Sequence, residues 1–372
     1  MWLSLASRQV FESRDIFSME QFIDEARAVR SGEELDAAKL DIFLKDMIPG
    51  LDGALTIEQF PSGFSNLTYL VRVGDRELVL RRPPFGSKVK AAHDMGREFR
   101  VLSALHPVYQ PAPKPLLYCT DLDVIGAPFY VMQRIKGAIL RSKKPEGFAC
   151  RPDLVRRCCA SFVDNLVRLH EVDYEAIGLA DLRREGSFVQ RQVDGWISRY
   201  HGSETDEIPA IEQTAAYLKD NCPADVAVVF IHNDYKFDNI VLDPNDLTRI
   251  IGVLDWEMCT IGDPLMDLGV VLSYWNEGDD PSLGVVPCFL TCEPGGMKRR
   301  EVAEEYAVRT GRDISNLKFY YVFGLLKLAV IIQQIYYRYK QGLTKDDRFG
   351  GLIFAVATLG MAAVKTIEGG EI

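Results

Sequence analysis

The chain has 372 residues, of which 47% are hydrophobic and 26% charged, values that exclude a disordered chain and suit two lobes or domains. Its net charge of −10 argues against general nucleic-acid binding, which needs a basic surface, but not against a nucleotide held by a few local cations. The eight cysteines form no repeated CxxC pair, so a zinc site is disfavoured and reduced thiols in the cytoplasm are expected.

The N-terminal 48 residues are predicted to be a helical extension. Residues 1–18 match no pattern that we can assign, and they lack the basic segment of a signal peptide. Residues 19–48 carry apolar side chains at roughly helical spacing, interrupted by a turn at residues 31–33. Helices are therefore expected on both sides of that turn.

Residues 49–136 are predicted to form a small antiparallel sheet with one helix, the first of two lobes. Apolar and polar residues alternate in short runs that turns containing glycine and serine separate, which is typical of strands with one buried face. The predicted strands cover residues 55–60, 67–73, 78–82, 116–119 and 128–133, and residues 91–105 have helical spacing.

Residues 137–372 are predicted to form a mostly helical second lobe. The expected helices cover residues 153–170, 210–221, 298–310, 317–340 and 352–367, and the expected strands cover residues 226–231, 240–242 and 250–254. The apolar run at residues 352–364 is interrupted and shorter than a bilayer requires, so it predicts a buried helix and no membrane span.

Polar residues between two of the apolar strands form the strongest functional signal. Residues 228–231 read as a buried strand, and His232-Asn233-Asp234-Tyr235-Lys236-Phe237-Asp238-Asn239 follows directly. Asp234 and Asn239 have the spacing of the protein-kinase catalytic loop, and Lys236 follows the aspartate by two positions. Polar groups there must be solvated, paired or metal-bound, so phosphoryl transfer is favoured over a plain hairpin loop.

Asp255 is the expected second metal ligand. It ends a predicted strand that can pair with residues 240–242, which would bring it beside Asn239. Oxygen ligands of this kind suit Mg²⁺. Glu257 is a candidate for a supporting group or a further ligand. Asp267 opens an apolar helix and is expected to cap it, with support of the catalytic loop as the alternative.

The first lobe offers candidates for binding phosphates. The turn Ser62-Gly63-Phe64-Ser65-Asn66 lies between two predicted strands and could approach phosphates with its backbone amides, although most such turns are only turns. Arg81 alternates with apolar neighbours on the next strand, and Glu98 on the following helix is its natural partner. An ordinary surface pair is the alternative, and Arg82 is the rival cation if the strand register differs by one.

These motifs resemble the aminoglycoside phosphotransferase family, which includes choline-kinase-like enzymes. The family pattern is H-G-D-x-x-x-x-N, then D-x-E/D, then G-D-P-x-x-D-L, and this chain carries His232 to Asn239, Asp255 with Glu257, and residues 262–268. The resemblance implies a bilobal protein-kinase-like α+β fold that uses ATP and Mg²⁺, with adenine against the linker near Gln133 and Ile135. Asn233 stands where glycine is usual, a departure that should be tolerable if the backbone stays at negative φ.

A closer resemblance is to the branch that is fused to acyl-CoA dehydrogenases in animals. Its features here are residues 80–84, residues 125–132 and the late residues 336–342, and arginine at position 81 is similar to that branch. The resemblance implies a hydroxyacyl-CoA as one acceptor hypothesis, for which Arg183, Arg184 and residues 298–300 are the candidate basic groups. An amino sugar, a choline-like amine, a sugar alcohol and a regulatory protein without catalysis stay open, as does the oligomeric state.

Overall fold

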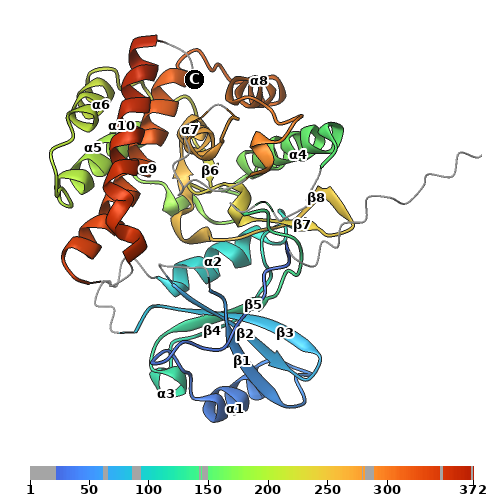
Figure 1. Ribbon diagram of the computed structural model, residues 1–372. Helices are drawn as coiled ribbons and strands as arrows, with labels where there is room; N and C mark the ends of the chain where they lie inside the picture. The colour runs from blue at the N-terminus through green and yellow to red at the C-terminus, as the bar shows by residue number, and fades with distance from the viewer. Residues whose placement is uncertain are drawn as a thin grey trace, which may run out of the picture.

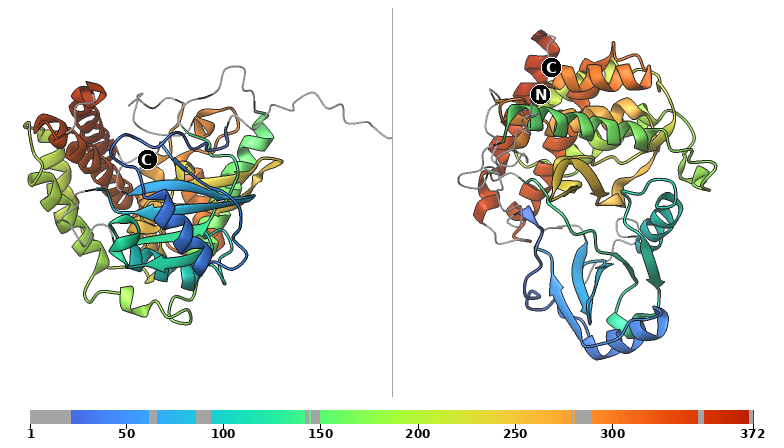
Figure 2. Two further views of the ribbon diagram at one scale, coloured as in Figure 1. Left: turned by 90° about the horizontal axis from the view of Figure 1, so that it is seen from below. Right: turned by 90° about the vertical axis from the view of Figure 1, so that its right-hand side faces the viewer.

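The structure is a computed structural model that describes residues 22–61, 66–85, 94–141, 144, 150–278, 280, 289–343, 347–369 and 372. A sheet-bearing N-lobe and a larger helical C-lobe follow each other along the chain, as Figure 1 shows by colour. The right-hand view of Figure 2 shows the same outline, with the blue and cyan sheet below and the helices above. The expected bilobal α+β architecture is confirmed.

The N-lobe is built on a five-stranded antiparallel sheet of order β1-β2-β3-β5-β4. Its strands are β1 Leu55–Gln59, β2 Leu67–Val73, β3 Arg76–Arg82, β4 Pro115–Cys119 and β5 Phe129–Gln133. Each of the five predicted strands is present within about two residues, because their alternating side chains are buried on two different faces.

Helices cover both faces of this sheet. Helix α2, Met95–Leu105, lies on the face toward the C-lobe, whereas α1, Ala37–Met47, and the short α3, Leu122–Ile125, lie on the far face (Figure 1). Helix α2 begins where the Asp94 side chain accepts a hydrogen bond from the Arg97 amide, a standard N-cap. The expected helix at 91–105 is therefore present from residue 95, and residues 91–93 lie outside the described part.

The helix expected before α1 is wrong for residues 22–36. Instead, Ile23 forms an isolated bridge with Ala138, and Arg27 forms another with Gln59 at the edge of the sheet. Both backbone hydrogen bonds between Arg27 and Gln59 are made, at 2.8 and 2.7 Å. Backbone pairing with the sheet edge is thus favoured over a helix here, and the spacing of apolar residues along the chain does not predict such pairing. The proposed domain boundaries at residues 48/49 and 136/137 stay a prediction.

The C-lobe contains the expected helices and two that the sequence did not predict in full. Its helices are α4 Pro152–His170, α5 Phe188–His201, α6 Pro209–Asp220, α7 Pro264–Tyr274, α8 Arg299–Thr310, α9 Leu317–Lys340 and α10 Leu352–Gly369. Helix α5 was not predicted, and α7 was predicted to open at Asp267 but begins three residues earlier, at Pro264. Helix α9 is buried along most of its length and forms the centre of this lobe.

Two short two-stranded ladders frame the predicted catalytic loop. Strand β6, Val229–Ile231, pairs with β9, Thr260–Gly262, which the sequence did not reveal. Strand β7, Ile240–Asp243, pairs with β8, Asp246–Val253, as an antiparallel hairpin. The loop leaves β6 and enters β7, so both of its ends are fixed by backbone pairing.

Within the described residues, two helices meet the length and composition of a membrane span, namely α9 and the segment Arg348–Gly369 that contains α10. The apolar window of α9 is 83% buried within the protein, which is typical of a core helix, and that of the second segment is 39% buried. The expectation that the late apolar run is too short to span is therefore not met on length alone. The seven cysteines in the described residues are free thiols.

Candidate active site

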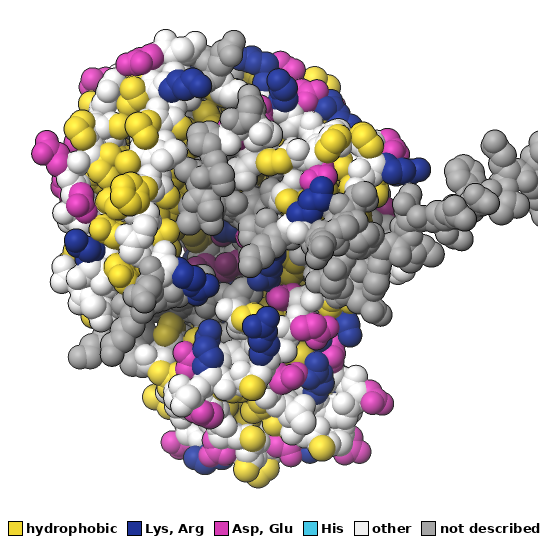
Figure 3. All heavy atoms as spheres, viewed as in Figure 1, with side chains coloured by type: hydrophobic (Ala, Val, Ile, Leu, Met, Phe, Trp, Pro, Cys, Tyr) yellow, Lys and Arg dark blue, Asp and Glu magenta, His cyan; other side chains and the backbone are white. Residues whose placement is uncertain are grey.

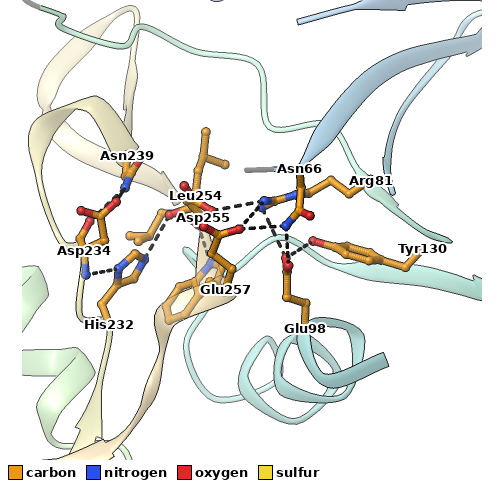
Figure 4. Close-up of polar contacts among 12 residues, drawn as sticks. Asn66, Arg81, Glu98, Tyr130, His232, Asp234, Asn239, Leu254, Asp255 and Glu257 are labelled. Carbon is orange, nitrogen blue, oxygen red and sulfur yellow. Dashed lines mark hydrogen bonds and ion pairs between the residues drawn. The ribbon is translucent and has the colours of Figure 1, made fainter. Parts of the chain in front are cut away.

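The predicted catalytic loop faces the N-lobe across a hollow. Figure 3 shows this hollow between the two lobes, with acidic side chains visible inside it. Figure 4 shows that residues from the loop, from the segment after β8 and from the N-lobe sheet point toward one another there. The structure thus brings together side chains that the sequence places up to about 190 positions apart, such as Asn66 and Glu257.

Asp234 lies at the centre of the loop's polar contacts. Lys236 Nζ donates to both carboxylate oxygens, at 2.9 and 2.8 Å, and Asn239 Nδ2 donates to Oδ2 at 3.0 Å. The Asp234 side chain keeps 15% of its surface exposed, so a hydroxyl from solvent has access to it. Burial alone would lower the pKa of Lys236, but Tyr274 and Asp234 raise it overall, so this lysine is a fixed cation.

His232 is fully buried beneath the loop and holds it in shape. Its Nδ1 accepts a hydrogen bond from the Asp234 amide at 3.3 Å, which leaves Nε2 to donate to the Leu254 carbonyl at 3.0 Å. Burial lowers the pKa of the imidazole, against the raising effect of Asp267 and Asp234. A neutral ring with this tautomer satisfies both contacts, so His232 connects the loop to the segment that carries Asp255.

Asn233 adopts φ +69°, which contradicts the expected negative φ. The left-handed region disfavours side chains with a Cβ, but asparagine tolerates it better than most residues. Asn233 therefore forms a left-handed turn directly before Asp234, at the position where the family pattern has glycine.

Asp267 supports the loop, which corrects the expected capping role. Its Oδ2 accepts from the His232 amide at 2.9 Å, and its Oδ1 accepts from the Asn233 amide at 2.8 Å. His170 Nε2 lies 3.1 Å from the same carboxylate. The cap of α7 is Asp263, whose side chain accepts from the Leu265 amide at 2.7 Å. Sequence position suggested the wrong residue because both aspartates lie near the helix start.

The β7–β8 hairpin places Asp255 beside Asn239, as predicted. Ile240 pairs with Val253 across the hairpin, and the Leu254 amide donates to the Asn239 carbonyl at 2.8 Å. Asp255 itself has φ +68°, a strained conformation of the kind that clusters at functional sites. The Asn239 amide nitrogen is used on Asp234, so its Oδ1 is the atom that remains available as an oxygen ligand.

Arg81, and not Arg82, faces this site. Arg81 is 7% exposed and lies 3.3 Å from Glu98 on α2 and 3.2 Å from Asp255. Arg82 points to the other face of the sheet, where it donates to the Ile125 carbonyl at 3.0 Å and its guanidinium lies over the Phe85 ring. The register of β3 against β5 therefore selects Arg81 over Arg82 as the arginine that faces the site.

Two supporting residues extend the Arg81–Glu98 pair. Tyr130 on β5 donates to Glu98 Oε2 at 2.8 Å, and Asn66 Nδ2 donates to Glu257 Oε2 at 2.8 Å and to Glu98 Oε1 at 3.3 Å. Burial raises the pKa of Glu98 and of Tyr130. No sequence pattern marks Tyr130 as a site residue, because its role depends on strand pairing: Tyr130 is the register partner of Arg81.

The structure describes only some of the remaining residues that were predicted to contact the nucleotide. Ser62, Gly63, Phe64 and Ser65 lie outside the described residues. Gln133 ends β5 and is exposed, and Ile135 follows it in the linker between the lobes. Both line a recess of about 350 Å³ together with His106, Gln110, Lys114 and Ile251. Their predicted contact with adenine stays a prediction.

Among the basic residues considered for a coenzyme A group, one is ion-paired and the others are exposed. Arg299 is ion-paired with Asp280 and lies 3.8 Å from Glu277, so its charge is already matched. Arg183, Arg184 and Arg300 are exposed. Lys298 is exposed as well, and a joint role of these residues in binding a coenzyme A group stays a prediction.

Comparison with known proteins identifies a similar family, similar sequences and similar structures. A model of the family described as "Phosphotransferase enzyme family" (APH) matches residues 56–288. Acyl-CoA dehydrogenase family member 11 from Rattus norvegicus is 35% identical over 322 residues, which cover 84% of this chain and 41% of that protein. The chain thus spans less than half the length of that relative.

Solved structures show the same fold. A crystal structure from Ralstonia eutropha, provisionally described as an aminoglycoside phosphotransferase, is 29% identical with a TM-score of 0.74, covering 89% of this chain and 99% of that one. A thermostable mutant of aminoglycoside phosphotransferase APH(4)-Ia, in ternary complex with AMP-PNP and hygromycin B, is 16% identical with a TM-score of 0.57, covering 89% and 99%. At that identity the second likeness shows the fold alone.

Proposed function

Because the chain belongs to the phosphotransferase enzyme family and its relatives include acyl-CoA dehydrogenase family members, we propose that it transfers the γ-phosphoryl group of ATP to a hydroxyl of a small molecule. The observation that carries this proposal is the convergence of Asp234, Asn239, Asp255 and Arg81 around one hollow. Phosphoryl transfer needs a carboxylate for the acceptor, oxygen ligands for a metal and a cation for the phosphates, and this group of side chains supplies all three.

ATP is the proposed donor. Arg81 supports this role because it is buried, paired with Glu98, and its Nε has no hydrogen-bond partner among the described residues. A guanidinium with a free donor suits a phosphate oxygen. We place the adenine against the linker at Gln133 and Ile135, and the phosphates under the turn that contains Asn66. The AMP-PNP in the complex of the APH(4)-Ia structure is consistent with this choice.

Mg²⁺ is the proposed metal, and the donor set fits it. The Asn239 amide oxygen and the Asp255 carboxylate are hard oxygen ligands, and they come from neighbouring ends of one hairpin. When bound, the ion would neutralise charge on the phosphate oxygens. Arg81 lies 3.2 Å from Asp255, so the arginine also fixes the orientation of that carboxylate.

Asp234 is the proposed base or orienting group for the acceptor. In the transfer, the acceptor oxygen bonds to the γ-phosphorus as the bond to the bridging oxygen of ADP breaks, and the acceptor proton passes to Asp234. Lys236 contacts both oxygens of that carboxylate, which fixes the orientation of Asp234 toward the hydroxyl. We propose that the lysine also approaches the transferred phosphoryl group.

A hydroxyacyl-CoA is the acceptor class that we favour. The support is the naming of the matched relatives as acyl-CoA dehydrogenases, although this chain aligns with only about two fifths of the rat protein. An amino-alcohol acceptor is the competing hypothesis, in line with the acidic net charge of −10.

The test is Mg²⁺-dependent conversion of ATP to ADP, measured with a panel of hydroxyacyl-CoA thioesters, amino sugars, choline and sugar alcohols. Turnover with one class, lost in Asp234→Asn, would support the proposal and name the acceptor. Binding of ATP without turnover on any acceptor would instead favour a regulatory nucleotide-binding protein.

A further inference from the structure

A buried lysine from the centre of the C-lobe contacts the catalytic loop. Lys327 lies on α9 and is 2% exposed, and its Nζ donates to the Asn233 carbonyl at 2.6 Å. The Asn233 side-chain oxygen lies 3.4 Å from the same nitrogen. No motif in the sequence pointed to this residue, because α9 reads as an apolar core helix.

Burying the Lys327 ammonium group costs desolvation free energy, which the contacts of that group must offset. A buried ammonium is normally paired with a carboxylate. Among the described residues, no carboxylate oxygen lies within 4.0 Å of the Lys327 nitrogen. Its neighbours are the carbonyl of Asn233, which accepts its hydrogen bond, and the Trp196 ring, whose centroid is 5.4 Å away. The short contact to the loop backbone is therefore the main interaction of this charge.

The packing of two helices brings Lys327 to the loop. A Cβ on Gly324 would lie 2.2 Å from the Gly269 carbonyl, and a Cβ on Gly269 would lie 2.1 Å from the Tyr320 carbonyl. Helices α7 and α9 thus cross at a distance that only glycine permits. Lys327 follows Gly324 by three residues, and Asp267 precedes Gly269 by two, so both polar residues lie within one helical turn of this crossing.

Together the two side chains hold opposite groups of the same turn. Asp267 accepts from the amides of His232 and Asn233, whereas Lys327 donates to the Asn233 carbonyl. The next residue is Asp234. We propose that Lys327 is a positioning residue that, with Asp267, fixes the left-handed turn at Asn233 and so aims the Asp234 carboxylate at the acceptor. This inference rests on the proposed phosphotransferase function.

The pKa of Lys327 predicts that its hydrogen bond to the loop depends on pH. Burial lowers the pKa of Lys327 to about 8, although Asp234 and Asp267 raise it, while Lys236 and Arg199 add to the lowering. These charges come from the loop, from α7 and from α5. The other elements packed on α9 are α6, α10 and the 3-10 turn Asp347–Gly351. Their described charged side chains are exposed, namely Glu212, Lys219, Asp220, Arg348, Lys365 and Glu368. The charge-assisted hydrogen bond should weaken above about pH 8.

The experiment compares Lys327→Met and Lys327→Arg with the wild type, and uses Lys318→Met on the same helix as the matched control. Two readouts are needed: kcat and the KM for ATP between pH 7 and 9.5, and hydrogen exchange of the amides of residues 232–234. We expect Lys327→Met to lower kcat by about 100-fold, the cost of misplacing a reacting group by about 1 Å, with little change in KM. Exchange should accelerate in that variant.

The arginine variant should recover part of the kcat and remove the decline above pH 8, because a guanidinium stays charged there. Unchanged kcat and unchanged exchange in Lys327→Met would overturn the proposal. If that variant does not fold, a wild-type kcat that is flat from pH 7 to 9.5 would overturn it. If the wild type turns over no acceptor, the proposed function fails, and the exchange of residues 232–234 alone decides whether Lys327 fixes the turn.

Discussion

The guanidinium of Arg81 on β3 lies 3.2 Å from the carboxylate of Asp255, a residue 174 positions later in the chain. The contact joins the N-lobe sheet to the end of the C-lobe hairpin. Arg81 also lies 3.3 Å from Glu98, so one buried cation connects α2 with the proposed metal ligand. The relative placement of the two lobes is therefore coupled to the geometry of the site.

The first prediction concerns the support of that cation. Tyr130→Phe removes the hydrogen bond to Glu98, and we expect a loss of about 2 kcal/mol in the free energy of unfolding, as for a buried bond to a charged group. The KM for ATP should rise because Glu98 is freer to move away from Arg81. Tyr118→Phe is the matched control, since Tyr118 pairs with Tyr130 in the sheet but is 36% exposed. Equal unfolding curves and KM values for the two variants would contradict this role.

The second prediction concerns Asp234. Asp234→Asn should lower turnover by about 10²–10⁴-fold, the usual contribution of a positioned general base. Binding of ADP, followed by isothermal titration, should be nearly unchanged because the carboxylate serves the acceptor and not the nucleotide. Asp243→Asn at the end of β7 is a control for a change of charge nearby. Retained turnover in Asp234→Asn would show that Asp234 is not the base or orienting group for the acceptor.

The third prediction concerns the proposed metal ligand. Asp255→Asn should raise the Mg²⁺ concentration needed for half-maximal turnover and weaken Mg²⁺-dependent ADP binding, because a charged oxygen ligand becomes neutral. The measurement is a Mg²⁺ titration at fixed nucleotide. Asp246→Asn, at the exposed start of β8, should leave the titration unchanged. An identical Mg²⁺ requirement in Asp255→Asn would exclude it as a ligand.

The fourth prediction concerns pH and stability. Burial lowers the pKa of His232 in the folded protein below its ordinary value of about 6.5. Above that value both states are neutral, whereas below it the unfolded chain binds the proton first, so stability falls as the pH drops toward the folded pKa. The melting temperature should therefore decrease from pH 7 to pH 5. The decrease should be smaller in His232→Gln than in a variant of the exposed His201, and equal slopes would count against this linkage.

The fifth prediction concerns the helix crossing. Gly324→Ala would place a methyl group about 2.2 Å from the Gly269 carbonyl, so α7 and α9 must separate. Overpacking of a tight core typically costs about 1–3 kcal/mol. We expect a lower melting temperature together with lower kcat, since the crossing carries Asp267. Gly342→Ala, in the turn after α9, tests a glycine of positive φ that has no neighbour within 4 Å. If Gly324→Ala lowers the stability but not kcat, the helix crossing does not position the catalytic loop.

Much of the fold could be predicted because its patterns are local. The first three N-lobe strands alternate apolar and polar residues, the last two are short apolar runs, and the helical spacing of residues 317–340 matches α9 residue for residue. The early helix at residues 22–36 was wrong for the converse reason. Its backbone pairs with Gln59 and Ala138, and such partners cannot be read from local spacing.

The proposed site shows the same division. The sequence by itself determined Asp234, Asn239 and Asp255 as a group, because their spacing and flanking strands are fixed along a short stretch of chain. Only the tertiary structure decided that Arg81 and not Arg82 faces them, that Tyr130 supports Glu98, and that Asp267 and Lys327 hold the turn at Asn233. Those choices depend on strand register and helix packing, which arise from contacts between residues distant in the chain.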